Sequence, residues 1–172
     1  MFTKIDLCSM ALLKLGEKPI QSLTEDTTAA QLARTLFDVV VDGLLATFPW
    51  RFATQTITLT RNSDGAYIIP ANVLRILKCD GKIMGNKIIS PADKIELIAL
   101  VKTEPESFPG YFATLVATKL ATEFCIPLIG DINVFKLMTA LYESEYQSAK
   151  FIDSTTSNQM HIDTFALIDS RF

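Results

Sequence analysis

Apolar residues recur at three- and four-residue spacing in four stretches of the chain, the pattern of helices that bury one face. The expected helices span residues 3–15, 27–47, 108–125 and 132–151. Thr3 can cap the first helix, because Asp6 three residues later completes a capping box. Pro49 is expected to end the second helix. The sequence therefore predicts a mainly α protein built on a four-helix core.

Between the second and third helices, the apolar pattern changes to a period of two. Residues 54–60 alternate and are rich in β-branched side chains, which is typical of a strand. Turn residues at 62–65 and 85–86 separate further short runs of this kind. The further strands are expected at residues 73–79, 82–84, 87–89 and 95–101. Residues 54–101 should therefore form a small β insertion in one helical domain that spans residues 1–153.

Strand edges in so small an insertion need cover, so part of it should meet a neighbouring subunit or another protein. The candidate residues lie at its first turn and are Arg61, Asn62, Asp64 and Gly65. Replacing residues 61–66 with a short neutral turn should then leave folding intact and weaken assembly.

The third expected helix carries two stripes beside its large apolar residues. Ser107 is its expected cap, and Pro127 with Gly130 should end it. One stripe is small enough to let another helix approach closely, and it consists of Ala113, Ala117, Ala121 and Cys125. The other is weakly polar and consists of Thr114, Thr118 and Thr122. The threonine stripe is expected to be either ordinary surface or an edge that meets a neighbouring subunit.

The last part of the sequence is an apolar stretch that follows a polar linker at residues 154–158. Its sizeable apolar residues are Met160, Ile162, Phe165, Leu167, Ile168 and Phe172. Full burial of each side chain is worth roughly 1.5–3 kcal/mol, before the entropy of ordering the segment is subtracted. Residues 154–172 should therefore form a tail that docks on another surface.

Composition narrows the class of protein. The 172 residues fit one domain, and 49% hydrophobic with 20% charged residues is the balance of a folded globular protein. A net charge of −3 without clustered Lys or Arg gives no reason to expect binding to nucleic acid. Cys8, Cys79 and Cys125 are far apart in apolar sequence, which favours buried free thiols. We expect synthesis in the cytoplasm and no membrane partner, because no apolar run approaches the ~20 residues that cross a bilayer.

Candidate chemistry is sparse. His161 is the only histidine, so a metal site or a general base would lack partners. Glu104 and Glu106 flank Pro105 and are the best carboxylate pair for a peptidoglycan hydrolase, although solvated loop carboxylates are the favoured interpretation. Trp50-Arg51-Phe52 is either a binding platform or an aromatic plug between the helices and the insertion. We therefore expect no catalytic residue, no cofactor and no metal.

Several segments occur in an order that resembles a known family. These segments are residues 12–20, 32–38, 44–53, 67–70, 73–76, 115–131 and 141–143. The best single marker is the Pro49-Trp50 corner, which Thr47 and Phe48 precede here. Together, over about residues 5–153, they resemble the tail tubular protein A and head-to-tail adaptor (head-completion) family of short-tailed phages.

This resemblance implies a helical bundle with a β-rich insertion, assembled as a ring of about a dozen copies beneath the portal protein. Such a ring sits at the head–tail junction of the virion, prevents loss of packaged DNA and offers a docking surface for tail components. The implied partners are the portal ring, neighbouring copies and a downstream tail or nozzle protein, with only incidental contact to DNA in the channel. The apolar tail would then dock on the portal or an adjacent subunit on assembly.

Two other classes remain open. The chain could be a cytoplasmic helical module for protein interaction, which would not recognise a portal. It could also be a peptidoglycan hydrolase associated with a phage tail, which would lose activity when Glu104 or Glu106 is changed.

Overall fold

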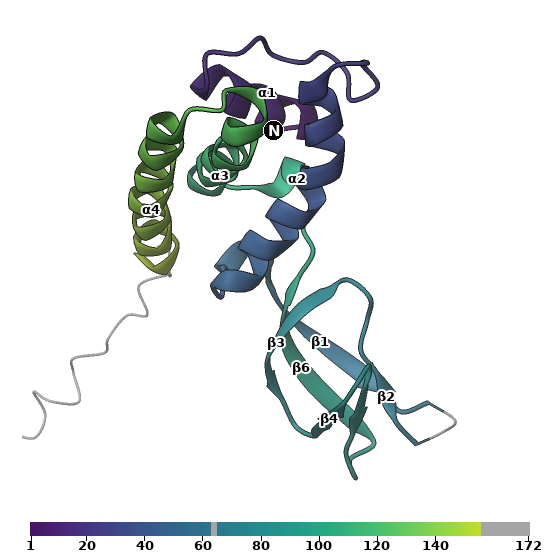
Figure 1. Ribbon diagram of the computed structural model, residues 1–172. Coiled ribbons are helices and arrows are strands. Elements are labelled where there is room, and N and C mark those ends of the chain that lie inside the picture. The colour runs from purple at the N-terminus through teal and green to yellow at the C-terminus, as the bar shows by residue number, and fades with distance from the viewer. Residues whose placement is uncertain (63–64, 156–172) are drawn as a thin grey trace, which may run out of the picture.

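The computed structural model describes residues 1–62 and 65–155 (Figure 1). Its four long helices are α1 (Lys4–Lys14), α2 (Thr28–Thr47), α3 (Gly110–Leu128) and α4 (Ile132–Thr155). Two short 3₁₀ helices are η1 (Arg51–Ala53) and η2 (Pro105–Ser107). The expected class, mainly helical with a β insertion between the second and third helices, is confirmed.

The N-terminal helix begins and ends as its sequence predicts. The Thr3 hydroxyl accepts from the Asp6 N–H at 3.1 Å, and the Thr3 N–H donates to the Asp6 carboxylate at 2.8 Å. These hydrogen bonds from Thr3 lower the pKa of Asp6. At the other end, Gly16 has a φ of +77°, which lets the Glu17 N–H return to the Leu12 carbonyl at 3.0 Å.

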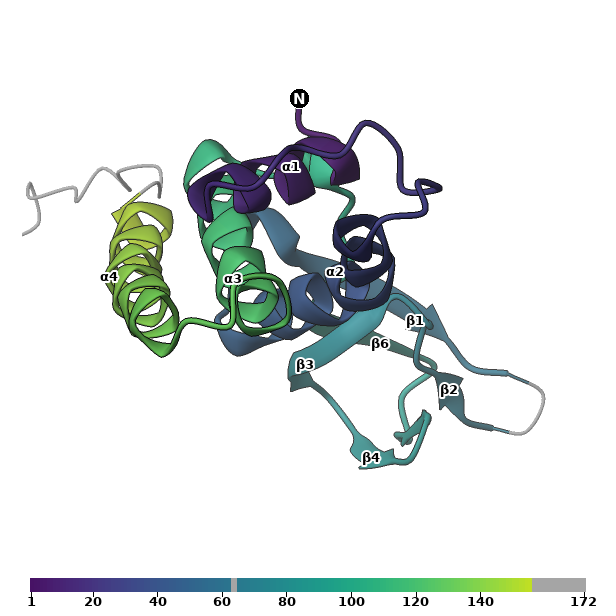
Figure 2. The ribbon, with the colours of Figure 1, turned by 45° about the horizontal axis from the view of Figure 1, so that its top comes forward.

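Helix α3 lies at the centre of the helical part, with α2 and α4 on opposite sides and α1 across it (Figures 1 and 2). Its small stripe, Ala113 to Cys125, is fully buried, as expected for a helix that others approach closely. Its large buried side chains are Phe112, Leu115, Val116, Leu120 and Phe124. Because most sides of α3 are buried, the remaining helices are arranged by the need to cover it.

Two of the three residues of the threonine stripe pack inside the subunit, against both expectations, whereas Thr114 is half-buried. Thr118 and Thr122 are buried, and the Thr118 hydroxyl donates to the Glu145 carboxylate of α4. The same carboxylate pairs with Lys14 of α1 at 3.2 Å. The Glu145 carboxylate thus links α4 to both α3 and α1, and the Thr118 hydroxyl has a hydrogen-bond partner within the apolar core.

The ends of α3 differ from the prediction. Ser107 belongs to η2, and Pro109 occupies the cap position without a side-chain hydrogen bond. Phe108 precedes that proline, and its extended backbone separates the two helices. At the C-terminal end, Pro127 lies inside the helix, because the missing N–H removes only one bond in its last turn. The N–H groups of Ile129 and Gly130 both return to the Cys125 carbonyl, at 2.8 and 3.1 Å.

Helix α4 continues four residues beyond its expected end at residue 151, so the polar linker does not begin at Ser154. The reason is Asp153, which is 1% exposed. Its carboxylate accepts from the backbone N–H of Arg51 at 3.1 Å and from the Tyr111 hydroxyl at 2.6 Å. Burial and this contact raise the pKa of Tyr111. The last turn of α4 is therefore held against the beginning of α3.

The β insertion contains two antiparallel sheets, each of three strands. The strands of the first sheet, in spatial order, are β1 (Thr54–Thr60), β6 (Lys94–Val101) and β3 (Val73–Cys79). Those of the second sheet are β2 (Tyr67–Ile68), β5 (Lys87–Ile89) and β4 (Lys82–Met84). Only the two-residue β2 was not expected, because it is too short to show a period. Tyr67 and Ile88 of the second sheet share a small core with Leu97 of the first.

The junction between helices and sheets is an aromatic plug. Trp50 is fully buried, and its indole N–H donates to the Leu44 carbonyl at 2.9 Å. Its ring lies 5.0 Å from that of Phe48 and 5.1 Å from that of Phe112, centroid to centroid. Arg75 of β3 donates to the Ala46 carbonyl at the C-terminal end of α2, at 3.2 Å. The binding-platform interpretation of Trp50 is therefore wrong.

We predict that Asp153→Ala lowers the free energy of unfolding by about 2–3 kcal/mol, and that Tyr111→Phe lowers it by about 1–2 kcal/mol. The alanine leaves two partly buried donors without their acceptor, whereas the phenylalanine removes one donor only. Chemical denaturation of both variants measures the losses. Ser154→Ala is the matched control, because Ser154 is exposed and should change stability by less than about 0.5 kcal/mol. Wild-type stability of the Asp153→Ala variant would contradict the claim that Asp153 holds the end of α4 against Arg51 and Tyr111.

Candidate interaction surfaces

Residues with reactive side chains are dispersed. Among residues 1–62 and 65–155, no group of three His, Cys, Asp or Glu residues is placed to hold a metal. Cys8 and Cys125 are buried, and burial raises the pKa of the Cys8 thiol to about 12, which keeps it protonated. Cys79 is only half-buried, against expectation, because it lies where β3 ends. Glu104 and Glu106 are exposed on either side of the buried Pro105, which favours the solvated-loop interpretation.

The first turn of the β insertion, at residues 61–66, makes hydrogen bonds that contribute to folding. The Arg61 guanidinium lies 3.0, 2.7 and 2.6 Å from the carbonyl oxygens of residues 90, 91 and 92. The Asn62 N–H donates to the Ala66 carbonyl, and the Asn62 side-chain oxygen accepts from the Ala66 N–H, both at 2.9 Å. Gly65 is exposed with a φ of +77°, and Asp64 lies outside the described residues. Replacement of all of residues 61–66 would therefore remove folding contacts, and a test of assembly should keep Arg61, Asn62 and Ala66.

Met160, Ile162, Phe165, Leu167, Ile168 and Phe172 lie outside the described residues, as does His161. Their role in interaction stays a prediction from sequence.

An exposed apolar surface that the sequence did not reveal covers the outer face of the second sheet. Ile68 pairs with Lys87, which pairs with Met84, so these three side chains share one face. Ile89 lies on the same face, opposite Lys82. Ile68, Met84 and Ile89 are each about half exposed. We call this apolar surface with its two lysines the sheet face.

A second exposed apolar surface runs along α4. Two of its residues are four positions apart, and the other two come 14 and 15 positions after the first, close to four helical turns, so all four project from one side of α4. The surface, here called the outer stripe, consists of Leu137, Leu141, Phe151 and Ile152. Leu137 is 63% exposed. The sequence pattern indicates one apolar face on α4, whereas this helix has two, so the outer stripe was not expected.

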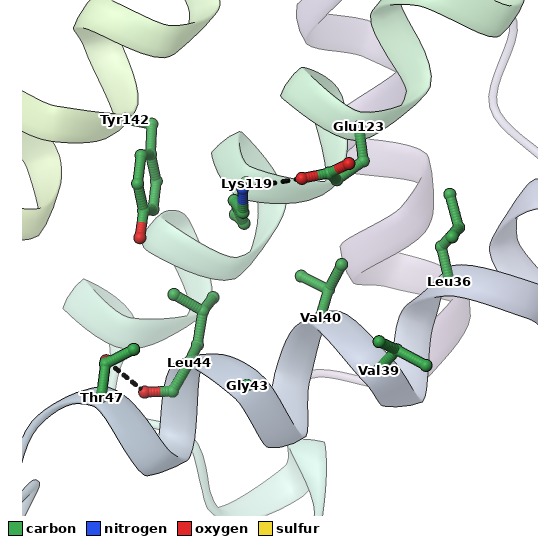
Figure 3. A pocket seen from close by; sticks show the side chains of 9 residues that line it. All are labelled: Leu36, Val39, Val40, Gly43, Leu44, Thr47, Lys119, Glu123 and Tyr142. Carbon is green, nitrogen blue, oxygen red and sulfur yellow. Dashed lines mark hydrogen bonds and ion pairs between the residues drawn. The ribbon is translucent and has the colours of Figure 1, made fainter.

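A groove of about 340 Å³ lies between α2, α3 and α4 (Figure 3). Its α2 wall is formed by Leu36, Val39, Val40, Gly43, Leu44 and Thr47. Tyr142 of α4 forms the opposite wall, and Lys119 and Glu123 of α3 form an ion pair at 2.7 Å between them. The Lys119 ammonium is 5.2 Å from the centre of the Tyr142 ring. Burial raises the pKa of Tyr142. We call this site the helical groove.

Comparison with known proteins adds no family. No protein-family model matches the chain, and no curated protein matches it. Within the part of the chain that the structure describes, no helix has the length and apolar character to span a membrane. The exposed surfaces are therefore the features of this fold that bear on its function.

We predict that Arg61→Ala lowers the free energy of unfolding by about 1–3 kcal/mol, because three backbone carbonyls lose a charged donor. Thermal or chemical unfolding measures the change. Lys87→Ala is the control, since Lys87 is exposed on the sheet face and should be nearly neutral. Equal stability of the two variants would mean that Arg61 is free for a partner after all.

Proposed function

We propose that the protein is a structural connector subunit of a phage or prophage virion, which joins copies of itself into a ring between portal and tail. The observation that carries this proposal is the presence of two different exposed apolar surfaces on one subunit, the outer stripe and the sheet face. The first belongs to the helical part and the second to the far end of the β insertion (Figure 1).

Two different surfaces are what ring formation requires. In a cyclic ring each subunit contacts its neighbours through two distinct patches, whereas a two-fold dimer uses one patch twice. Exposed apolar patches rimmed by polar residues are typical of protein interfaces. The outer stripe suits a neighbouring helix surface. The sheet face, with Lys82 and Lys87, suits a partner surface that carries acidic residues.

The segments that resemble the connector family support the same proposal. Their best marker, Pro49-Trp50, lies at the plug that fixes the β insertion on the helices. A connector needs this joint to be rigid, because its insertion has to reach a neighbour or a tail component in a fixed direction. The exposed position of Glu104 and Glu106 gives the hydrolase alternative no supporting observation.

The proposal predicts that Leu137→Glu combined with Leu141→Glu abolishes occupancy of a portal ring while the subunit stays folded. Each leucine contributes roughly 1.5–3 kcal/mol when buried. The association constant should therefore fall about tenfold or more for each substitution. Co-sedimentation of the purified protein with the portal ring of the same phage or prophage measures occupancy, and circular dichroism confirms folding.

Ile132→Glu is the matched control for this experiment. Ile132 is 53% exposed on the same helix, but its helical position lies off the outer stripe. It should leave occupancy unchanged. Wild-type occupancy by the double variant would remove the outer stripe from the interface, and a wild-type protein that ignores the portal would argue for the cytoplasmic interaction module.

A further inference from the structure

The helical groove is suited to apolar side chains. Val39 is 69% exposed on its α2 wall, so much of that wall faces solvent. Polar groups of the groove bond within the protein: Lys119 pairs with Glu123, and the Thr47 hydroxyl donates to the Leu44 carbonyl at 2.7 Å. Small-molecule sites use convergent polar groups to orient their ligand. The groove therefore favours a peptide segment that buries apolar side chains over a polar small molecule.

The segment that begins nearest to the groove is this chain's own residues 156–172. They follow Thr155, the end of α4. Asp153 is hydrogen-bonded to the backbone of Arg51, and Arg51 lies four residues after Thr47, which lines one end of the groove. Four residues span at most about 14 Å. The segment therefore starts close to that end of the groove, where α2 and α4 both finish (Figure 1).

The length and composition of the segment match the groove. Residues 36–47 of α2 cover about 17 Å along the helix axis, whereas residues 156–172 can reach about 60 Å when extended. The first four residues of the segment, 156–159, are polar and can bridge about 14 Å. The six apolar residues from Met160 to Phe172 follow directly. A short tether also gives the chain's own segment an effective concentration in the mM range, which favours it over the segment of a second copy.

We propose that residues 156–172 occupy the helical groove of the same chain in the free subunit, with their apolar side chains against Leu36, Val39 and Val40. The occupied groove is a property of the single subunit, so it goes beyond the proposed function and does not depend on it. If the ring also forms, the portal or a neighbour has to displace the segment before using its apolar residues.

Amide hydrogen exchange of the full-length protein, followed by mass spectrometry at a concentration where it is monomeric, tests this inference. In the wild type, peptides from residues 160–172 should exchange more slowly than an unstructured peptide of the same sequence. Val39→Glu should raise their exchange rate about tenfold, equivalent to about 1.4 kcal/mol, because a carboxylate replaces an apolar contact. Ile168→Asp should have the same effect from the side of the segment.

Leu137→Glu is the matched control, since Leu137 is about as exposed as Val39 but belongs to the outer stripe. It should leave exchange of residues 160–172 unchanged, even though the connector proposal expects it to weaken the ring. Unprotected exchange in the wild type would overturn the inference, as would protection that is insensitive to Val39→Glu and Ile168→Asp. Protection that appears only as the protein concentration rises would also overturn it, because the occupant would then come from a second copy.

Discussion

The structure depends on the burial of α3. This helix is apolar or small on most of its surface, with Lys119 and Glu123 on the remaining side, so it is stable only when other helices cover its apolar sides. Helices α1, α2 and α4 supply that cover, and the Lys14–Glu145–Thr118 cluster fixes the contact of α1, α3 and α4. Because α2 and α4 lie on opposite sides of α3, they stand apart above Lys119 and Glu123. The helical groove and the outer stripe both follow from this arrangement.

The elements were predictable where the chain carries local signals. Thr3 and Asp6 form the capping box that their spacing predicts, and alternation locates β1, β3, β4 and β5 at their observed bounds. Contacts between distant residues could not be predicted. Asp153 extends α4 because Arg51 and Tyr111 meet it, and Arg61 is held by the loop at residues 90–92. In the sequence pattern, Asp153 looks like the end of a helix and Arg61 looks like part of an exposed turn.

The candidate surfaces were harder to find for a related reason. Leu137 and Leu141 follow helical spacing, but nothing in the pattern shows which of two apolar faces meets α3. Val39 is two positions from the buried Phe37 and Val41 on α2 and therefore points away from the side that they bury, and it is exposed. The order of the segments that resemble connector proteins thus suggested a ring, whereas the surfaces available for its contacts needed the fold. A subunit with two unlike apolar surfaces and a closely packed joint between its parts is consistent with a structural role in assembly.

The most direct test of this account is the mass of the product formed when the purified protein is mixed with the portal ring of the same phage or prophage. Mass photometry or native mass spectrometry resolves the number of added subunits. The proposed ring predicts one discrete product, the portal ring plus about a dozen subunits, because a closed ring holds a fixed number of copies. A mixture that keeps the separate masses of portal and free protein at concentrations of tens of micromolar, where even weak complexes of about −7 kcal/mol form, would contradict it.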